Sequence, residues 1–119
     1  MREVPAYRIS FDEATFTVSP LKDRTDIVRT KNWSQVERAT AFKRDLMVVD
    51  CICLALFLSD ERVLELNEEM AGWDIFVESL PSYLPGCMRF DDWFSRVAFP
   101  AFATNEMEIF SRHKNEQAG

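Results

Sequence analysis

The longest run of hydrophobic residues lies near the middle of the chain. Residues 51–58 read C-I-C-L-A-L-F-L, and the polar residues 59–61, S-D-E, end the run. Eight apolar residues between polar breaks are short for a helix and favour a strand that is buried on both faces. In residues 62–67, Leu64 and Leu66 share one face, which is the two-residue period of a half-buried strand. The pattern therefore predicts a β-hairpin.

Shorter strands are predicted before this hairpin. Apolar and polar residues alternate at 7–11, and residues 12–14, D-E-A, predict a turn. Residues 15–18 are rich in β-branched and aromatic side chains and predict a second strand. Residues 27–30 predict a third strand, after a polar loop at 21–26.

Residues 32–45 admit two interpretations. Asn32 caps a single helical turn that brings Trp33 and Val36 to the same side. Residues 37–45 then either extend this helix or form a strand. The strand is indicated by the alternation of Ala39 and Ala41 with larger side chains. We favour one turn followed by a strand.

The C-terminal third predicts two helices. Five apolar residues fall at helical spacing and predict an amphipathic helix over about 69–80, which ends near Pro81: Trp73, Phe76, Val77, Leu80 and Leu84. A short second helix over about 91–97 has Asp91 as its cap. Phe99 and Phe102 are expected in the core. Residues 106–112 admit strand or helix, and their alternation with glutamate favours a strand.

These elements predict one α+β domain over residues 1–119, with a polar, frayed tail at 113–119. The chain has 119 residues and 47% hydrophobic residues, enough for one core. The expected architecture is a bent antiparallel sheet or partly open barrel, packed by the helix at about 69–80 and the short helix at about 91–97.

Charge and cysteine content limit the partners. Fourteen Lys and Arg against twenty Asp and Glu give a net charge of -6, which disfavours binding to nucleic acid or to anionic membrane surfaces. We find no apolar stretch long enough to span a bilayer and no apolar signal segment at the start. Three cysteines without a leader predict reduced thiols and a cytoplasmic protein.

Candidate chemistry is sparse. Cys51 and Cys53 share one face of a strand, but a zinc site needs two further ligands, so we interpret them as inert core residues. His113 is the single histidine and lies in the polar tail. We therefore predict no catalytic residue, no metal and no cofactor. Lys43 or Arg44 is expected to pair with Asp50 and to join two strand ends.

The order of elements resembles the pleckstrin-homology-type barrel, in which a bent sheet is plugged by a helix. Four segments also resemble small uncharacterised bacterial proteins: A-F-K-R-D-L at 41–46, D-C-I-C-L at 50–54, E-E-M-A-G-W at 68–73 and P-A-F-A-T-N-E at 100–106. The resemblance implies the barrel-like order alone. Some thirty residues follow the long helix, and the basic phosphoinositide-binding loop is missing, so lipid recognition is not implied.

The sequence favours a non-enzymatic module that binds a partner protein through an acidic surface, as antitoxin-like or immunity-like proteins do. The candidate partner-binding residues are two acidic pairs that bracket the long helix: Glu68, Glu69, Asp91 and Asp92. The alternative is a small-molecule binder, or an enzyme that uses carboxylates, with a pocket between sheet and helix. A homodimer through a sheet edge or through Trp93 and Phe94 is compatible with either hypothesis.

Overall fold

The computed structural model describes residues 7–21, 28–45, 50–99 and 105–112. These residues form strands and helices in an α+β arrangement, as the sequence predicts. The elements are β1 (Tyr7–Phe11), β2 (Thr15–Pro20), β3 (Arg29–Asn32), the 3-10 turn η1 (Trp33–Gln35), β4 (Val36–Asp45), β5 (Asp50–Leu58), β6 (Val63–Asn67), α1 (Trp73–Tyr83), α2 (Phe90–Ala98) and β7 (Glu106–Ser111).

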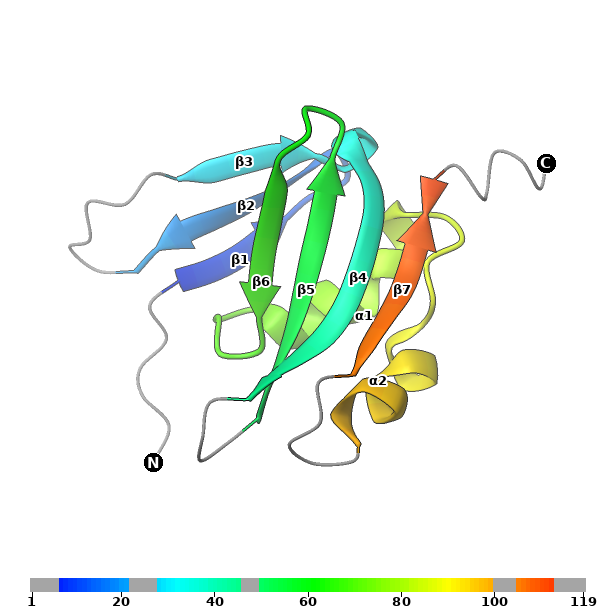
Figure 1. The fold of residues 1–119 in the computed structure, drawn as a ribbon. Coiled ribbons are helices and arrows are strands. Elements are labelled where there is room, and N and C mark those ends of the chain that lie inside the picture. Colours follow the sequence, from blue (N-terminus) through cyan, green and yellow to red (C-terminus); the bar gives the residue numbers. More distant parts are fainter. Residues whose placement is uncertain (1–6, 22–27, 46–49, 100–104, 113–119) are drawn as a thin grey trace.

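The strands form two antiparallel sheets. One sheet has the order β1-β2-β3 and the other has the order β6-β5-β4-β7, and the chain passes from the first to the second through η1. Figure 1 shows the strands of the smaller sheet crossing those of the larger one at a wide angle. The described strands do not close a barrel.

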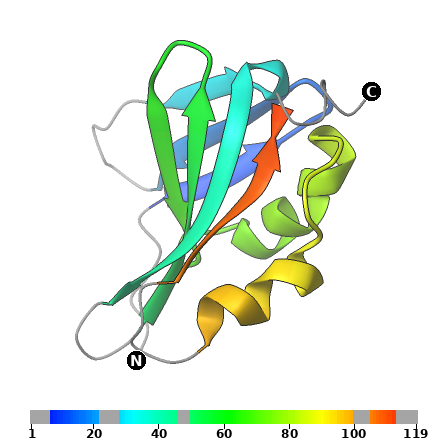
Figure 2. The same ribbon diagram turned by 45° about the vertical axis from the view of Figure 1, so that its right-hand side comes forward.

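One face of the larger sheet carries the core. Figures 1 and 2 show the smaller sheet and both helices on the same side of the larger sheet, with α2 alongside β4 and β7. Among the described elements, none covers the opposite face. The largest side chains that lie fully inside the core include Trp93, Phe16, Phe76, Leu54, Leu56 and Leu80.

The predicted central hairpin is present as β5 and β6. Leu54 pairs with Leu66 and Leu56 with Leu64, so the apolar faces of both strands point to the core. Burial of β5 on both faces, however, holds for only its first half. Ala55 and Phe57 lie on the outer face and are half-buried, and the guanidinium of Arg38 lies over the Phe57 ring, 4.0 Å from its centre.

Stacked aromatic rings join the smaller sheet to α1. The ring of Trp33 stacks on Tyr83 with centroids 5.0 Å apart and on Phe76 with centroids 5.6 Å apart. Phe16 from β2 packs against Trp33 at 4.8 Å. Trp33 Nε1 donates to the carbonyl of Asp12 at 2.9 Å, which satisfies its polar end. This packing holds η1 where the chain passes between the sheets.

Both ambiguous segments are strands. Residues 32–45 form one turn and then β4, which pairs with β5 along its length. Residues 106–111 form β7, which pairs with the other edge of β4. The favoured interpretation of each segment is confirmed, because alternating residues meet a neighbouring strand on a pleated surface.

The helix boundaries differ from the predicted ones. α1 begins at Trp73 instead of residue 69, because Ala71 pairs with β1 and Gly72 takes a left-handed φ of 86°. It continues to Tyr83 with Pro81 inside it. α2 has Arg89 as its N-cap, so the predicted cap at Asp91 is wrong, and this residue lies in the first turn.

Other predictions have mixed outcomes. Of the strand predicted at 27–30, residue 27 lies outside the described residues and Val28 precedes the strand, which continues to Asn32 because residues 29–32 pair with β2. Phe99 is 66% exposed, so its predicted place in the core is wrong. Phe102 and the tail at 113–119 lie outside the described residues.

Candidate functional site

Two of the four sheet edges are covered. In the smaller sheet, Ile9 N donates to Ala71 O at 2.8 Å and Ala71 N donates to Tyr7 O at 2.9 Å, so the segment before α1 lies along β1. In the larger sheet, Met88 N donates to Ile109 O of β7 at 2.9 Å. The edges β3 and β6 remain, and we find no backbone hydrogen bond across either within the described ranges.

The register shows which backbone groups of β3 point outward. Trp33 N donates to Ala14 O at 3.0 Å, and Trp33 is opposite Ala14 when the β2–β3 pairing is extended by one residue. Because hydrogen-bonded and non-hydrogen-bonded pairs alternate, Lys31 and Arg29 bond to β2 while Thr30 points its N–H and C=O away from the sheet. The N–H of Asn32 already donates to Gln35 Oε1 at 2.8 Å. Thr30 is thus the central open position of this edge.

The same reasoning applies to β6. Leu58 N donates to Arg62 O at 2.9 Å, so the alternate residues Val63 and Glu65 direct their backbone groups outward. Val63 is 52% exposed. The two open edges therefore belong to different sheets and are separated by a groove.

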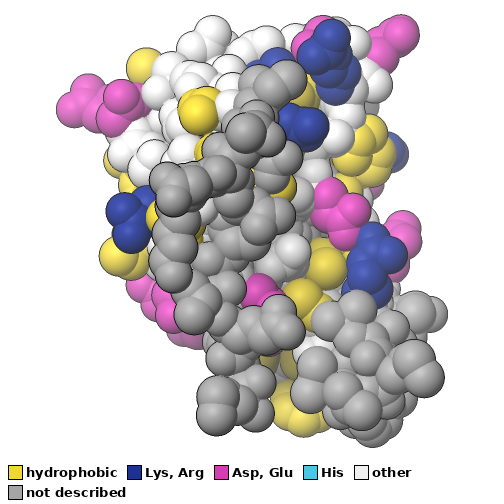
Figure 3. Space-filling view, turned by 90° about the vertical axis from the view of Figure 1, so that its left-hand side faces the viewer, with side chains coloured by type: hydrophobic (Ala, Val, Ile, Leu, Met, Phe, Trp, Pro, Cys, Tyr) yellow, Lys and Arg dark blue, Asp and Glu magenta, His cyan; other side chains and the backbone are white. Residues whose placement is uncertain are grey.

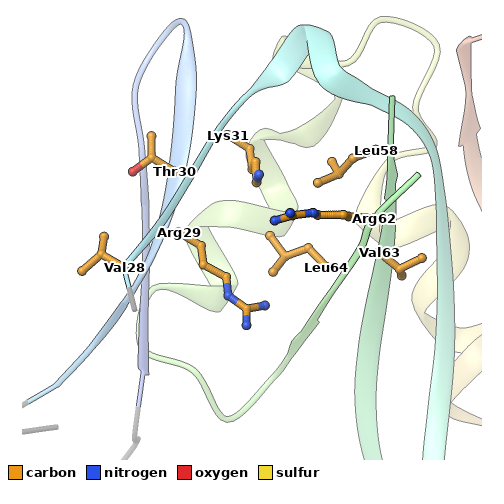
Figure 4. A pocket seen from close by; sticks show the side chains of 8 residues that line it. All are labelled: Val28, Arg29, Thr30, Lys31, Leu58, Arg62, Val63 and Leu64. Carbon is orange, nitrogen blue, oxygen red and sulfur yellow. The ribbon is translucent and has the colours of Figure 1, made fainter. Parts of the chain in front are cut away.

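The groove between β3 and β6 has a volume of about 510 Å³. Eight residues line it: Val28, Arg29, Thr30, Lys31, Leu58, Arg62, Val63 and Leu64. In Figure 4, Arg29 and Lys31 point from β3 toward Leu58 and Leu64, while Thr30 points to the other side of its strand. Both leucines are buried and form an apolar floor. This combination gives the groove an apolar base with cations along its wall.

The charge of the groove is opposite to that of the chain. The lining holds three cations and no carboxylate, although the net charge of the chain is -6. Asp60 lies beside this wall, and its carboxylate is 3.9 Å from Lys31 Nζ and 4.0 Å from Arg62 Nε. Figure 3 shows this side of the molecule, where Lys and Arg lie among hydrophobic and acidic side chains.

The sequence prediction missed this groove. Its signal is the spacing of Arg29 and Lys31, which are two residues apart and therefore on one face of the strand. They lie opposite Val18 and Phe16, both buried, so they occupy the core-facing side of β3. Cations on that side of an edge strand are unusual, but recognising them requires the pairing register.

The predicted partner-binding residues lie in two places. Glu68 and Glu69 follow β6, and Asp91 and Asp92 lie in the first turn of α2. Glu68 is half-buried and its Oε2 accepts from Ile52 N at 3.0 Å, so this carboxylate holds the β5–β6 end together. The other three are exposed. Of the four predicted residues, Glu68 therefore has a structural contact that a partner would have to compete with.

The cysteines are buried among apolar groups. Cys51 and Cys53 lie on one face of β5, where a hydrogen bond between the two thiols raises the pKa of Cys53 and lowers that of Cys51. Burial raises the pKa of Cys87 to about 12. Within the described ranges, no three His, Cys, Asp or Glu side chains are grouped closely enough to hold a metal ion.

Charged residues of β4 join neighbouring elements. Lys43 is 2% exposed, and its Nζ lies 3.4 Å from Asp50 Oδ2 and donates to Ala98 O at 2.8 Å. The predicted ion pair with Asp50 is therefore present, with Lys43 as the cation. Arg44 pairs with Glu65 of β6 instead, on the exposed face.

Comparison with protein-family models, curated proteins and solved structures gives no match. In the part of the chain that the structure describes, no helix has the length and hydrophobicity needed to cross a bilayer.

Proposed function

We propose that this chain is a non-enzymatic protein-binding module that holds an extended segment of its partner in the groove between β3 and β6. The observation that carries the proposal is the pair of open sheet edges on either side of an apolar floor. An extended peptide adds to such an edge through main-chain hydrogen bonds, and side-chain pockets supply its specificity. The outward groups of Thr30 provide the hydrogen bonds, while Leu58 and Leu64 provide the apolar contact.

The packing favours this proposal over the alternative of a pocket between sheet and helix. Trp93, Phe76 and Leu80 are fully buried there, in the space that a small-molecule site would need. The full burial of Trp93 also disfavours a homodimer through this residue. A homodimer through the open edges remains compatible with the groove, because a second copy is one source of an extended strand.

The acidic surface stays a separate prediction. Glu69, Asp91 and Asp92 are exposed and suit a basic partner, such as the target of an antitoxin-like or immunity-like protein. Reversing their charges together with Glu68 tests that surface. The resemblance to the pleckstrin-homology-type barrel is also a proposal, supported by the run of described strands, β1 to β6, that precedes α1.

A peptide-display selection tests the proposed function. We would pan random twelve-residue peptides against the immobilised full chain and titrate the selected peptides into the 15N-labelled protein. The amide resonances of Thr30, Val63 and Leu64 are expected to shift. Selection of no binding peptide, or shifts confined to Glu69, Asp91 and Asp92, would contradict the groove.

Substitutions at Thr30 supply a matched pair of variants. T30P removes the outward N–H without removing a hydrogen bond to β2, so peptide binding should be lost. T30V removes the hydroxyl that contacts Thr17 Oγ1 at 3.0 Å but keeps the N–H, so binding should persist. Equal affinity of T30P and T30V would show that strand addition at β3 is not the mode of binding.

A further inference from the structure

We infer that the segment bound in the groove is acidic, with two carboxylates spaced two residues apart. This inference rests on the proposed function and adds the chemistry of its ligand. It follows from the positions of Arg29 and Lys31 on β3 and from the direction of the open edge at Thr30.

Strand addition fixes which ligand residues meet the cations. The ligand residue opposite Thr30 exchanges the main-chain hydrogen bonds, and its two neighbours lie opposite Arg29 and Lys31. Side chains of those two neighbours point to the same face as the cations, toward the groove. Opposite charges directly across a strand pair stabilise the pairing. The matching ligand therefore has Glu or Asp at positions n and n+2.

The surroundings strengthen the preference for an anion. The guanidinium of Arg29 faces the groove, and within the described ranges no acidic side chain pairs with it. Lys31 has Asp60 only at 3.9 Å, which is a loose separation for an ion pair. Arg62 approaches from the far wall, so a ligand carboxylate in the groove lies within a field of three cations.

The residue between the two carboxylates meets a different surface. It lies beside Thr30 and Thr17, whose hydroxyl oxygens are 3.0 Å apart on the outer face. A β-branched or polar residue suits this position, because it packs on a pleated surface and meets no charge. The preferred core of the ligand is therefore Glu-x-Glu with a β-branched residue at x.

Synthetic peptides test the inference with the full chain. The probe is a fluorescent nine-residue peptide of threonine and valine with glutamates two positions apart. Its controls have glutamine at both positions, or the glutamates three positions apart. In anisotropy titrations, both controls should bind more weakly than the probe. The glutamine peptide loses both cross-strand charge pairs and should bind about 2- to 30-fold more weakly, whereas the peptide with displaced glutamates loses one pair and should bind about 1.4- to 5-fold more weakly. The difference in affinity between the probe and its controls should decrease at high salt, because salt screens the charge pairs.

Charge reversal on the protein gives the decisive comparison. The R29E/K31E variant should lose the preference for the glutamate peptide and gain one for the same peptide with lysines. R8E is the matched control, because Arg8 is an exposed cation on β1, away from the groove lining. Gain of lysine-peptide binding requires a folded variant, so loss of folding cannot imitate it.

The outcomes separate this inference from the proposed function. Display-selected peptides that shift Thr30 but lack paired acids would overturn the inference and leave the groove as a binding site. The inference is also overturned, with the groove kept as a binding site, if wild type and R29E/K31E each bind the glutamate peptide and the lysine peptide with equal affinity. If R29A/K31A aggregates but binds the glutamate peptide with unchanged affinity, the cations protect an open edge and the inference is wrong.

Discussion

At the scale of single residues, Gly72 is the position where the backbone tolerates no side chain. Its φ of 86° is left-handed, and a Cβ there would lie 2.4 Å from Ile9 O. Both features arise because the chain turns from β6 into α1 while it lies along β1. The contact explains why α1 begins at Trp73, after this glycine.

The G72A variant tests this close approach. Left-handed strain alone costs about 1–3 kcal/mol for a residue with a side chain. We expect G72A to lower the free energy of unfolding by more than this, because β1 must also move. G86A is the control, since Gly86 has a positive φ of 93° in the turn that follows α1. Urea unfolding of both variants measures the difference. Equal destabilisation would contradict the role of the contact with β1.

Asp12 gives the β1–β2 turn a dependence on pH. Its Oδ1 accepts from Thr15 N at 2.8 Å and Ala14 N at 2.9 Å, and these backbone donors lower its pKa below the usual value. A lowered pKa means that the stabilisation is complete above the pKa of the unfolded chain, about 4, and is lost as pH falls through the folded value.

Comparing wild type with D12N measures this dependence. The wild-type advantage in the free energy of unfolding should be present at pH 7 and shrink at pH 3, because a neutral amide at position 12 does not titrate. Urea unfolding at both pH values checks it. An advantage of the same size at pH 3 and pH 7 would show that the charge of Asp12 does not stabilise the turn.

At the scale of elements, neighbouring residues of β4 provide two unlike ion pairs. Lys43 is buried and links β4 to Asp50 of β5 and to the end of α2, whereas Arg44 and Glu65 are exposed. Breaking a buried pair leaves a charge without compensation and costs about 3–5 kcal/mol, whereas exposed pairs contribute about 0–1 kcal/mol. The Asp50 side chain is 17% exposed, so the lower end applies.

The K43A and R44A variants test this contrast. K43A should lower the free energy of unfolding by several times the effect of R44A, and it should loosen the contact of α2 with β4. Chemical denaturation measures the first effect, and amide exchange of α2 measures the second. Similar losses for both variants would contradict the assignment of Lys43 as the link between β4, β5 and α2.

The sequence predicted elements well where their period was strong. The β5–β6 hairpin, η1 followed by β4, and β7 were all recognisable because apolar residues alternate or run together. The first residue of α1 and the exposure of Phe99 were missed. Contacts distant in sequence decide both, such as that between Gly72 and Ile9, and periodicity carries no information about them.

At the scale of the whole molecule, the candidate site was the part that sequence reasoning could not reach. The groove unites β3 with β6, which are separated by β4 and β5 and belong to different sheets. The excess of acidic residues favoured an acidic surface, whereas the groove gathers cations from both strands. Only the register of β3 shows that Arg29 and Lys31 face inward and that Thr30 faces an open edge.

Hydrogen exchange at the Thr30 amide tests the central claim most directly, because that N–H is predicted to point out of the sheet. In the free protein, the amide of Thr30 should exchange much faster than those of Arg29 and Lys31, which donate to β2. In complex with a display-selected peptide, the exchange of Thr30 should slow to the rate of its neighbours. A Thr30 amide already protected in the free protein, or one that exchanges equally fast with peptide bound, would contradict strand addition at β3.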